Sequence, residues 1–334
     1  MTKLKDVALA AGVSIATVSL ALNGSPLVNA DTREKVTALA YQMGYAPNTY
    51  ARKLVNKRSG SIGIIVPDIE NSFYASLVRY INDFLKDTEY SLYISISGNE
   101  PELEDKAIRD MISNRMEGII YIPIIKPREK SGAIEALLRA EMPVVCATTL
   151  YPSGLLPCVM SDLYRGMYEM TVHVLEKGYR RIAYITGRKG TFALDTREEG
   201  FTHALRDSHF ECEVVKHTMD EVTYQAAYEG AEDLLASGAI PEAVICVNDI
   251  MALGVINTLH RHGIRVPDDV AVTGFDDGIF AEASPVPITT VRQDIKAIAV
   301  KSAEMLFALI KKEISSAEIA NDIVPISLIK RMSL

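Results

Sequence analysis

The amino-acid sequence predicts a multidomain chain, with a small all-α headpiece at the N-terminus and an α/β core of two doubly wound lobes behind it. Residues 4–43 show helical spacing of apolar side chains and no strand signal. From residue 62 onward, short apolar runs alternate with longer helical patterns, which is typical of parallel sheets covered by helices on both faces. The length of 334 residues is enough for two or three compact units.

The first element is a pair of short helices in the run DVALAAGVSIATVS, residues 6–19. The pattern predicts helices over about 4–11 and 15–23. Gly12 ends the first, because only glycine turns sharply there at little steric cost, and Ser14 can cap the second by accepting the Thr17 N–H. The residues predicted to form a shared core are Val7, Ala8, Val13, Val18 and Leu22. This is a helix-turn-helix pattern, whose second helix can enter a DNA major groove; an ordinary αα-hairpin is the alternative.

A third helix begins after Asn29, a good N-cap, and runs to about residue 43, where Gly44 stops it. A segment over residues 48–55 and the polar run 56–61 follow. Residues 1–60 contain eight Lys and Arg against three acids, a charge of +5, whereas the whole chain carries −8. A cationic head on an anionic body suits a protein that binds phosphates at one end, although a solvated mixed-charge face is the alternative.

The core is predicted from its alternating apolar runs. We expect strands over residues 62–66, 91–96, 118–122, 144–147, 182–186, 212–216, 243–247 and 270–274. We expect helices near 73–86, 101–114, 130–140, 164–177, 196–208, 224–237, 249–262 and 295–312. Ligands of open α/β sheets bind beyond the carboxyl ends of the strands. The side chains predicted to lie there are Asp68, Asn71, Ser72, Phe73, Thr148, Arg197, Asn248, Asp249, Asp276 and Asp277.

Several motifs, in order, resemble the lactose/galactose repressor family of bacterial transcription factors. They are DVAxxAGVSxxTVSxxLN, TREKV and GYxPN in the first 48 residues, then IGIIVPDIENSFY, GYRRIAYITG, TREEGF, VNDIMALG, VAVTGFDD and PITTVRQD. The resemblance spans nearly the whole chain. It implies a headpiece over 1–47, a hinge helix and linker over 48–61, and a periplasmic-binding-protein-like core. It also implies a first lobe of 62–161 plus 291–322 and a second of 162–290 plus 323–334.

The resemblance implies a sequence-specific, DNA-binding regulator, a repressor, controlled by a small molecule bound between the lobes. The family's ligand-holding arginine, aspartate and asparagine correspond to Arg197, Asp276 and Asn248, and the predicted effector site adds Phe73 and Thr148. A carboxylate and a guanidinium suit the hydroxyls of a carbohydrate. A purely structural Arg197–Asp276 pair is the alternative. An aromatic that often stacks on the effector corresponds to Val222, with Tyr224 as a possible substitute.

The predicted recognition helix departs from the family in its side chains. Leu20 stands where relatives carry a polar residue, often an arginine that reads guanine, and Ile15 and Ala16 are apolar too. Apolar groups favour thymine methyls, so we expect T·A pairs at that place in the operator half-site. Short polar side chains suit phosphates, although Ser19 could equally bond within its own helix. The predicted headpiece contacts with DNA are Ser14, Ile15, Ala16, Thr17, Ser19, Leu20, Asn23 and Asn48.

The hinge segment over 48–55 is too short to be a stable helix alone, but two copies could fold together on DNA. Ala51 and Leu54 are then DNA contacts, with Leu54 as an apolar wedge in the minor groove; packing of Leu54 on its own headpiece is the alternative. A homodimer on a pseudo-palindromic operator follows. Candidate interface elements are the helix near Ser72 and the helix 250–262, with Met251, Leu253, Val255 and Leu259. No heptad tail follows the last strand, which favours a dimer over a tetramer.

The sequence argues against several other classes of protein. GxSxG, GxxxxGK[ST] and GxGxxG are absent, so we expect neither an enzyme nor a cofactor. The four cysteines and six histidines show no metal-ligand spacing, and we expect no metal. No signal peptide or membrane span is evident, which predicts a cytoplasmic protein without a membrane partner. The alternatives are a soluble sugar-binding protein without DNA function, or a regulator whose effector is a nucleobase or a partner protein.

Overall fold

The computed structural model describes residues 2–45, 59–124, 132–151, 154, 156–238, 240–315 and 320–334. They form two compact units, residues 1–59 and residues 60–334, each described here by itself. The described part of the chain holds no single helix long and apolar enough to cross a membrane. Among the described residues, one pair of helices, Leu4–Ala11 and Ile15–Leu22, has the required length and apolar composition when taken together, but the pair is bent by 101°.

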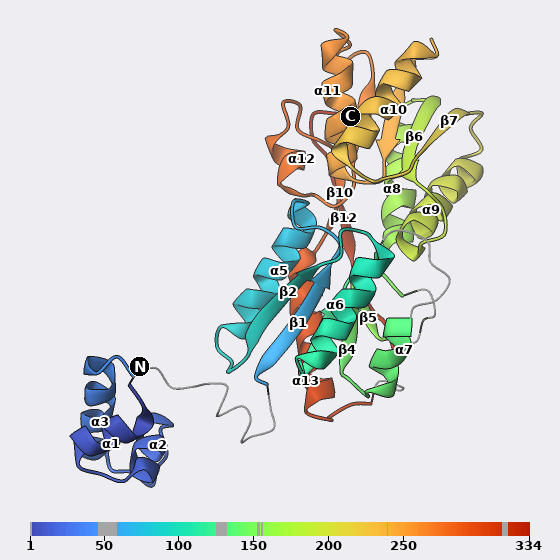
Figure 1. Ribbon diagram of the computed structural model, residues 1–334. Coiled ribbons are helices and arrows are strands. Elements are labelled where there is room, and N and C mark those ends of the chain that lie inside the picture. Colours follow the sequence, from blue (N-terminus) through green and yellow to red (C-terminus); the bar gives the residue numbers. More distant parts are fainter. Residues whose placement is uncertain are drawn as a thin grey trace. The chain divides into compact units, whose positions relative to one another are not determined.

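The headpiece consists of α1 (Leu4–Ala11), α2 (Ile15–Leu22) and α3 (Ala30–Gln42) (Figure 1). Gly12 ends α1 with a φ of 72°, and the Ser14 hydroxyl accepts the Thr17 N–H at 3.0 Å, so both local predictions are confirmed. Asn29 caps α3 by accepting the Thr32 N–H at 2.8 Å. The headpiece core is built mainly from small side chains: Val7, Ala8, Ala11, Val18, Ala21, Val28, Val36 and Ala40.

The first lobe is a six-stranded parallel sheet in the order β11-β5-β4-β3-β1-β2. Its strands are β1 (Ser61–Val66), β2 (Ser91–Ile96), β3 (Gly118–Tyr121), β4 (Val144–Ala147), β5 (Cys158–Ser161) and β11 (Asp322–Val324). Its helices are α5 (Ser72–Leu85), α6 (Pro101–Ser113), α7 (Gly132–Arg139) and α13 (Ile295–Ile310). Ile62 and Ile64 pack with α5 and α13 on one face, while Ile65 packs with α6 and α7 on the other. Burial on both faces explains why β1 is apolar throughout.

The second lobe is a four-stranded parallel sheet in the order β7-β6-β8-β9. Its strands are β6 (Arg181–Gly187), β7 (Glu213–Met219), β8 (Ala243–Cys246) and β9 (Ala271–Thr273). Its helices are α8 (Leu163–Glu176), α9 (Phe192–Ser208), α10 (Tyr224–Ala236), α11 (Asp249–Arg261) and α12 (Ile279–Ala283). An antiparallel pair, β10 (Thr290–Gln293) and β12 (Ile326–Ile329), crosses between the lobes (Figure 1).

The predicted core elements are all present, with shifted ends. The largest shift is in α9, which begins at Phe192 instead of residue 196. The sequence analysis missed β5, α12, β10, β11 and β12, which are three to five residues long and therefore carry too little periodicity to be recognised. β11 ends at Val324, two residues beyond the expected end of the first lobe at 322, because Ile323 and Val324 still pair with β5.

Gly200 on α9 allows the closest helix approach in the second lobe. A methyl group there would overlap the backbone carbonyl oxygen of Tyr164 on α8. We therefore expect Gly200→Ala to lower the free energy of unfolding by about 1–3 kcal/mol, the usual cost of overpacking. Gly132→Ala is the matched control, because its methyl group would meet nothing within 4 Å. Urea unfolding followed by circular dichroism checks this, and equal stabilities of the two variants would refute the close approach.

Candidate functional site

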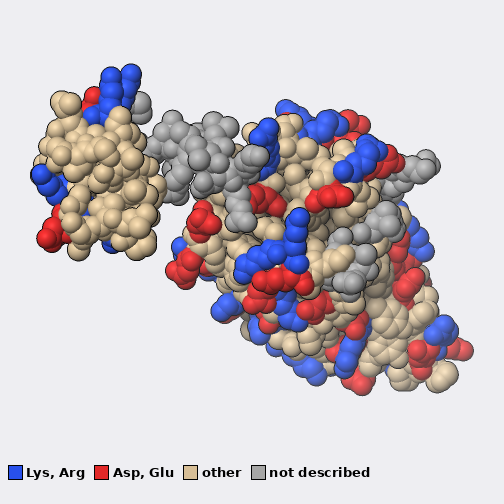
Figure 2. Space-filling model, turned by 90° about the horizontal axis from the view of Figure 1, so that it is seen from below, with Lys and Arg blue, Asp and Glu red and all other residues tan. Residues whose placement is uncertain are grey.

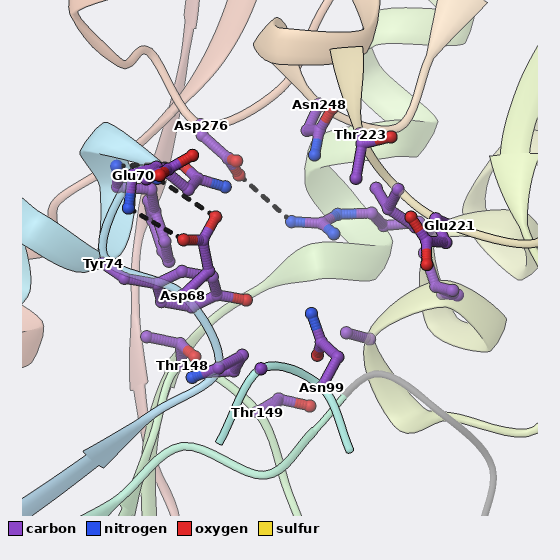
Figure 3. Close-up of a pocket in the computed structure, with 18 of the residues that line it drawn as sticks. Asp68, Glu70, Tyr74, Asn99, Thr148, Thr149, Glu221, Thr223, Asn248 and Asp276 are labelled. Atoms are coloured by element: carbon purple, nitrogen blue, oxygen red, sulfur yellow. Dashed lines mark hydrogen bonds and ion pairs between the residues drawn. The ribbon is translucent and has the colours of Figure 1, made fainter. Parts of the chain in front are cut away.

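A cavity of about 630 Å³ lies where the carboxyl ends of strands from both lobes meet. The first lobe contributes residues from its loops and from the start of α5: Asp68, Phe73, Tyr74, Asn99 and Thr148. The second lobe contributes residues from α9, from the loops before α9, α10 and α11, and from the loop after β9 (Figure 3). The five predicted effector residues all line this cavity: Phe73, Thr148, Arg197, Asn248 and Asp276. The volume is ample for a small organic molecule.

Arg197 and Asp276 form the polar centre of the cavity. The Arg197 Nη2 donates to Asp276 Oδ1 at 3.2 Å, and both side chains are 11% exposed. The Gln293 Nε2 donates to the same oxygen at 2.7 Å, which leaves Asp276 Oδ2 without a bond to any described residue. The guanidinium also lies 4.3 Å from the centre of the Phe275 ring. The pair is thus held by its surroundings while part of its bonding capacity is unused.

Burial governs the protonation of this centre. It raises the pKa of the Asp276 carboxyl to about 6, and the nearby Arg197 guanidinium and the Gln293 amide oppose that rise. Asp276 also has a φ of 110°, and Thr148 one of 70°, which are left-handed conformations that side-chain-bearing residues rarely adopt. Such strain concentrates at ligand-binding positions, where the surrounding structure enforces it.

Asn248 both caps α11 and reaches the cavity. Its Oδ1 accepts the Met251 N–H at 3.0 Å, so the Nδ2 amide is the half that the cap does not use. The neighbouring Asp249 does not line the cavity. It is buried, and it accepts bonds from the Thr290 hydroxyl and the Gly278 N–H. Burial, followed by the adjacent Asp276 carboxylate, raises the Asp249 pKa well above its usual range.

Of the remaining residues predicted beyond the strand ends, some line the cavity and others do not. Asp68 and Asn71 line the cavity. Asp277 does not, because its carboxylate is paired with Arg292 and Arg331, whose nitrogens lie 2.5 and 2.6 Å from it. Ser72 lies outside this cavity, beside a much smaller void of about 10 Å³.

The position predicted for a stacking aromatic is filled by Val222, which does line the cavity. Tyr224, the suggested substitute, does not, because its hydroxyl accepts a bond from Asn257 at 3.0 Å, away from the cavity. Sequence reasoning missed Tyr74, Asn99 and Gln293. The adjacent Phe73 was a signal for Tyr74, whereas Gln293 enters the cavity only through the crossing of the chain at β10.

The second candidate site is the surface of α2 in the headpiece. Ile15 and Leu20 are 51% and 38% exposed, and Ala16 is exposed beside them. Thr17 and Ser19 are half-buried on the same helix, with Ser14 and Asn23 exposed at its two ends. No charged side chain occurs on α2. The predicted hinge contacts Asn48, Ala51 and Leu54 lie outside the described residues.

The described headpiece carries little net positive charge, with Lys3, Lys5, Arg33 and Lys35 against three acids. Figure 2 shows a mostly uncharged surface there. Two of these bases have structural partners: Arg33 donates to the carbonyls of Ser25 and Val28, and Lys35 donates to that of Ala11 at 3.0 Å. Half of the positive charge counted in residues 1–60 therefore belongs to the segment 46–58, outside the described residues.

A helix-turn-helix unit joined to a two-lobed α/β core with an interlobe cavity defines a class of protein, the ligand-responsive DNA-binding regulators. The model "Bacterial regulatory proteins, lacI family" matches residues 3–48, and the periplasmic binding protein-like domain model matches residues 171–334. The transcriptional regulator RegA of Clostridium saccharobutylicum is 33% identical over 93% of each chain. Catabolite control protein A of Priestia megaterium is 30% identical over 92% of each chain.

Solved structures of transcriptional regulators also match this chain over nearly its whole length. The lac repressor dimer bound to operator and the anti-inducer ONPF matches with a TM-score of 0.86 at 25% identity, over 99% of this chain and 98% of that one. The complex of the transcriptional regulator CelR with cellobiose matches with a TM-score of 0.71 at 26% identity, over 100% of both chains. The chain belongs to the LacI family and is a DNA-binding transcriptional regulator. The resemblance predicted from the motifs is confirmed, and the relatives, which are transcriptional regulators, also confirm that the chain is not an enzyme.

Proposed function

We propose that this regulator is a homodimeric repressor whose operator affinity is set by a small hydroxylated molecule, a carbohydrate, bound in the interlobe cavity. The observation that carries the proposal is the buried Arg197–Asp276 pair, which retains unused bonding capacity inside a cavity of about 630 Å³. A solved relative, CelR, holds cellobiose, which supports a saccharide. The experiment is a thermal-shift screen of sugars, nucleosides and phosphosugars, followed by operator binding with and without each hit. A hit that left operator affinity unchanged would count against the proposal.

The proposed ligand contacts follow from chemistry. Asp276 Oδ2 accepts ligand hydroxyls, and the unused N–H groups of Arg197 donate to ligand oxygens. The Asn248 amide donates from the second lobe, while Phe73 and Thr148 contact the ligand from the first. Because the two sets of groups belong to different lobes, a ligand bridging them favours one relative orientation of the lobes. The coupling to operator affinity is then typically ~1–3 kcal/mol.

The proposed DNA contacts divide into two groups. Ile15, Ala16 and Leu20 face base edges in the major groove, because they are the exposed side chains of α2. The short polar residues contact phosphates, which position the headpiece without specifying sequence. These are Ser14, Thr17, Ser19 and Asn23. We also propose that Asn48, Ala51 and Leu54 contact DNA from the hinge, with Leu54 in the minor groove.

Leu20 offers a direct test of the readout. Selection of bound DNA from random pools should enrich T·A at the base pair facing Leu20, since its side chain can contact a thymine methyl but cannot bond guanine. Leu20→Arg should shift that pair to G·C by about tenfold or more, because a bidentate arginine–guanine contact discriminates by ~1–3 kcal/mol. Leu27→Arg is the control: Leu27 is 83% exposed but lies outside α2, so its pool should match the unmodified protein's. Guanine enrichment opposite Leu20 would refute this readout.

The proposed dimer uses apolar surface that neither lobe covers. Tyr93 and Ile94 on the edge strand β2 are 51% and 46% exposed, and Ile279 on α12 is 67% exposed. An exposed apolar edge strand is typical of a surface that another chain covers, because its backbone groups are unpaired and its side chains are in water. A second copy is the partner we propose, and the lac repressor relative is a dimer.

The helix α11, a predicted interface element, offers less apolar surface than expected. Met251, Val255 and Leu259 are buried in their own lobe, and Leu253 packs against the same core. Helices α10 and α11 also approach each other closely, since a methyl group on Gly254 would lie 2.6 Å from the Tyr224 carbonyl oxygen. Of these four side chains, only Leu253, which is half-buried, retains surface for an interface. On α5, the other candidate element, Leu77 and Ile81 are likewise buried.

A further inference from the structure

The cavity has a surplus of negative charge. Its lining includes five carboxylates and two guanidinium groups. Two of the carboxylates are balanced, Asp276 by Arg197 and Asp220 by Arg188, whose Nε lies 2.7 Å away. Asp68, Glu70 and Glu221 form no ion pair with any residue in the described part of the chain. A cleft lined by one sign of charge concentrates ligands of the opposite sign and repels those of the same sign.

The unbalanced Asp68 carboxylate and the paired Asp276 carboxylate both lie close enough to Tyr74 to act on its hydroxyl. In the view of Figure 3, the carboxylates of Asp68 from the first lobe and Asp276 from the second lie on the same side of the cavity, across from Glu221 and Thr223, and Tyr74 lies beside Asp68. Asp68 is fixed in place, because its two carboxylate oxygens accept the backbone N–H groups of Glu70 and Asn71 at 2.8 and 3.2 Å. Burial, followed by the Asp276 carboxylate, raises the pKa of the Tyr74 hydroxyl, and Asp68 acts in the same direction. Both carboxylates therefore act on one point in the cavity.

Two buried polar atoms of the lining lack hydrogen-bond partners among the described residues, and they independently indicate a ligand. Gln293 is 4% exposed, and because its Nε2 is bonded to Asp276, its Oε1 is left as an acceptor. The Arg197 Nε is a buried donor without a partner. Buried groups of this kind are costly unless something bonds them. A ligand that satisfies both must offer an acceptor to the Arg197 Nε and a donor to the Gln293 Oε1, which hydroxyl and ammonium groups together supply.

A metal ion does not fit this surplus. In the described ranges, no three His, Cys, Asp or Glu side chains are grouped closely enough to hold one. An ammonium group does fit, because it is a compact cation with three donors that can reach several acceptors at once. Coulomb attraction between an ammonium group and neighbouring carboxylates is stronger in a partly buried site than in bulk water, and the same field repels a phosphate or carboxylate group of a ligand.

We propose, on the basis of the function proposed above, that the effector is a hydroxylated amine such as an amino sugar, with its ammonium group between Asp68 and Asp276. Its hydroxyl oxygens accept from the Arg197 Nε, and its remaining donors reach Gln293 Oε1. Bridging by the ammonium group relieves the repulsion between the two lobes' carboxylates, so amine binding favours the closed cleft. Phosphorylated and carboxylated sugars are excluded by the same charges.

Thermal-shift titrations on matched sets of compounds test this assignment. Each set contains a hexose (glucose, galactose or mannose), its 2-amino-2-deoxy form, its 6-phosphate and its uronic acid. In the set whose stereochemistry fits, the amine should bind at least about tenfold more tightly than the neutral sugar, or ~1.4 kcal/mol, and the anionic members should give no shift. Tighter binding of a neutral or anionic member would overturn the inference while leaving an effector site in place. Absence of binding by every compound would count against the proposed function as well.

Substitutions that remove a carboxylate charge while keeping the shape of the side chain test whether charge selects the amine. Asp68→Asn should weaken binding of the amine at least about tenfold more than binding of the neutral sugar, because it removes the charge and keeps an acceptor. Asp87→Asn is the matched control, since Asp87 is an exposed carboxylate of the same lobe outside the cavity. Should Asp68→Asn lower the melting temperature of the ligand-free protein, Asp68→Ser carries the test, because its uncharged hydroxyl can still accept a backbone N–H group of the loop. If Asp68→Asn weakened binding of the amine and of the neutral sugar by the same factor, the proposed attraction between the ammonium group and Asp68 would be overturned.

Discussion

Asp276→Ala is expected to abolish effector binding and, with it, any effector-dependent change in operator affinity. The substitution removes the acceptor at the centre of the cavity, where Arg197 and Gln293 converge at 3.2 and 2.7 Å. Hydrogen bonds to charged groups are worth about 1.5–3 kcal/mol each. Loss of two ligand hydroxyl bonds to Asp276 Oδ2 corresponds to a roughly 100-fold or greater loss of ligand affinity. Isothermal titration with a screened ligand measures it.

Folding has to be separated from binding in this experiment, because Asp276→Ala leaves the Arg197 guanidinium buried without its carboxylate. Asp276→Asn preserves the volume and an acceptor oxygen for both neighbours. Since burial already raises the pKa of this carboxyl to about 6, a neutral side chain is compatible with the site. Asp276→Asn should therefore keep the melting temperature and still lose most of the affinity. Asp233→Asn, which alters an exposed carboxylate on α10 of the same lobe, should change neither. Unchanged affinity in Asp276→Asn would remove the aspartate from the ligand site.

Ile94→Asp is expected to convert the dimer into monomers and to reduce operator affinity by about 100-fold or more. The side chain lies on the edge strand β2, where a second copy would cover it, and a carboxylate there would be desolvated without a partner. Two headpieces held together gain 10²–10⁴-fold in avidity, which separated headpieces lose. Sedimentation equilibrium gives the oligomeric state, and binding to an operator fragment at fixed salt gives the affinity.

Leu138→Asp is the matched control for the dimer experiment. Leu138 on α7 is exposed to a similar degree, 42%, but belongs to another surface of the same lobe. It should leave both the dimer and operator binding intact. A dimeric Ile94→Asp protein would move the interface away from β2, and dissociation by Leu138→Asp would place it at α7 instead.

The headpiece was predictable because its signals are local. Gly12 adopts the left-handed turn, and Ser14 and Asn29 make the cap bonds, all within a few residues in sequence. Most core strands were predictable for a related reason: burial on both faces makes a strand continuously apolar, as in β1 and β8.

The crossing elements were not predictable from periodicity. β10 and β12 pair across more than 30 residues of sequence, and each is only four residues long. The same crossing brings Gln293 to Asp276, so this cavity residue could not be found without the topology. The proposed dimer surface was missed because the exposure of Tyr93 and Ile94 depends on β2 lying at an edge of the sheet, which only the strand order reveals.

We propose that one molecule bound in the interlobe cavity controls the affinity of the protein for its operator. Reciprocal titration tests this most directly. Operator affinity is measured with and without saturating ligand, and ligand affinity is measured with and without saturating operator. Thermodynamic linkage requires the two affinities to change by the same factor, roughly 5–150-fold for typical couplings. We expect the two affinities to change by equal factors in the unmodified protein, and we expect the ligand to leave operator affinity unchanged in Asp276→Asn. Tight ligand binding with a factor of one in both titrations would contradict it.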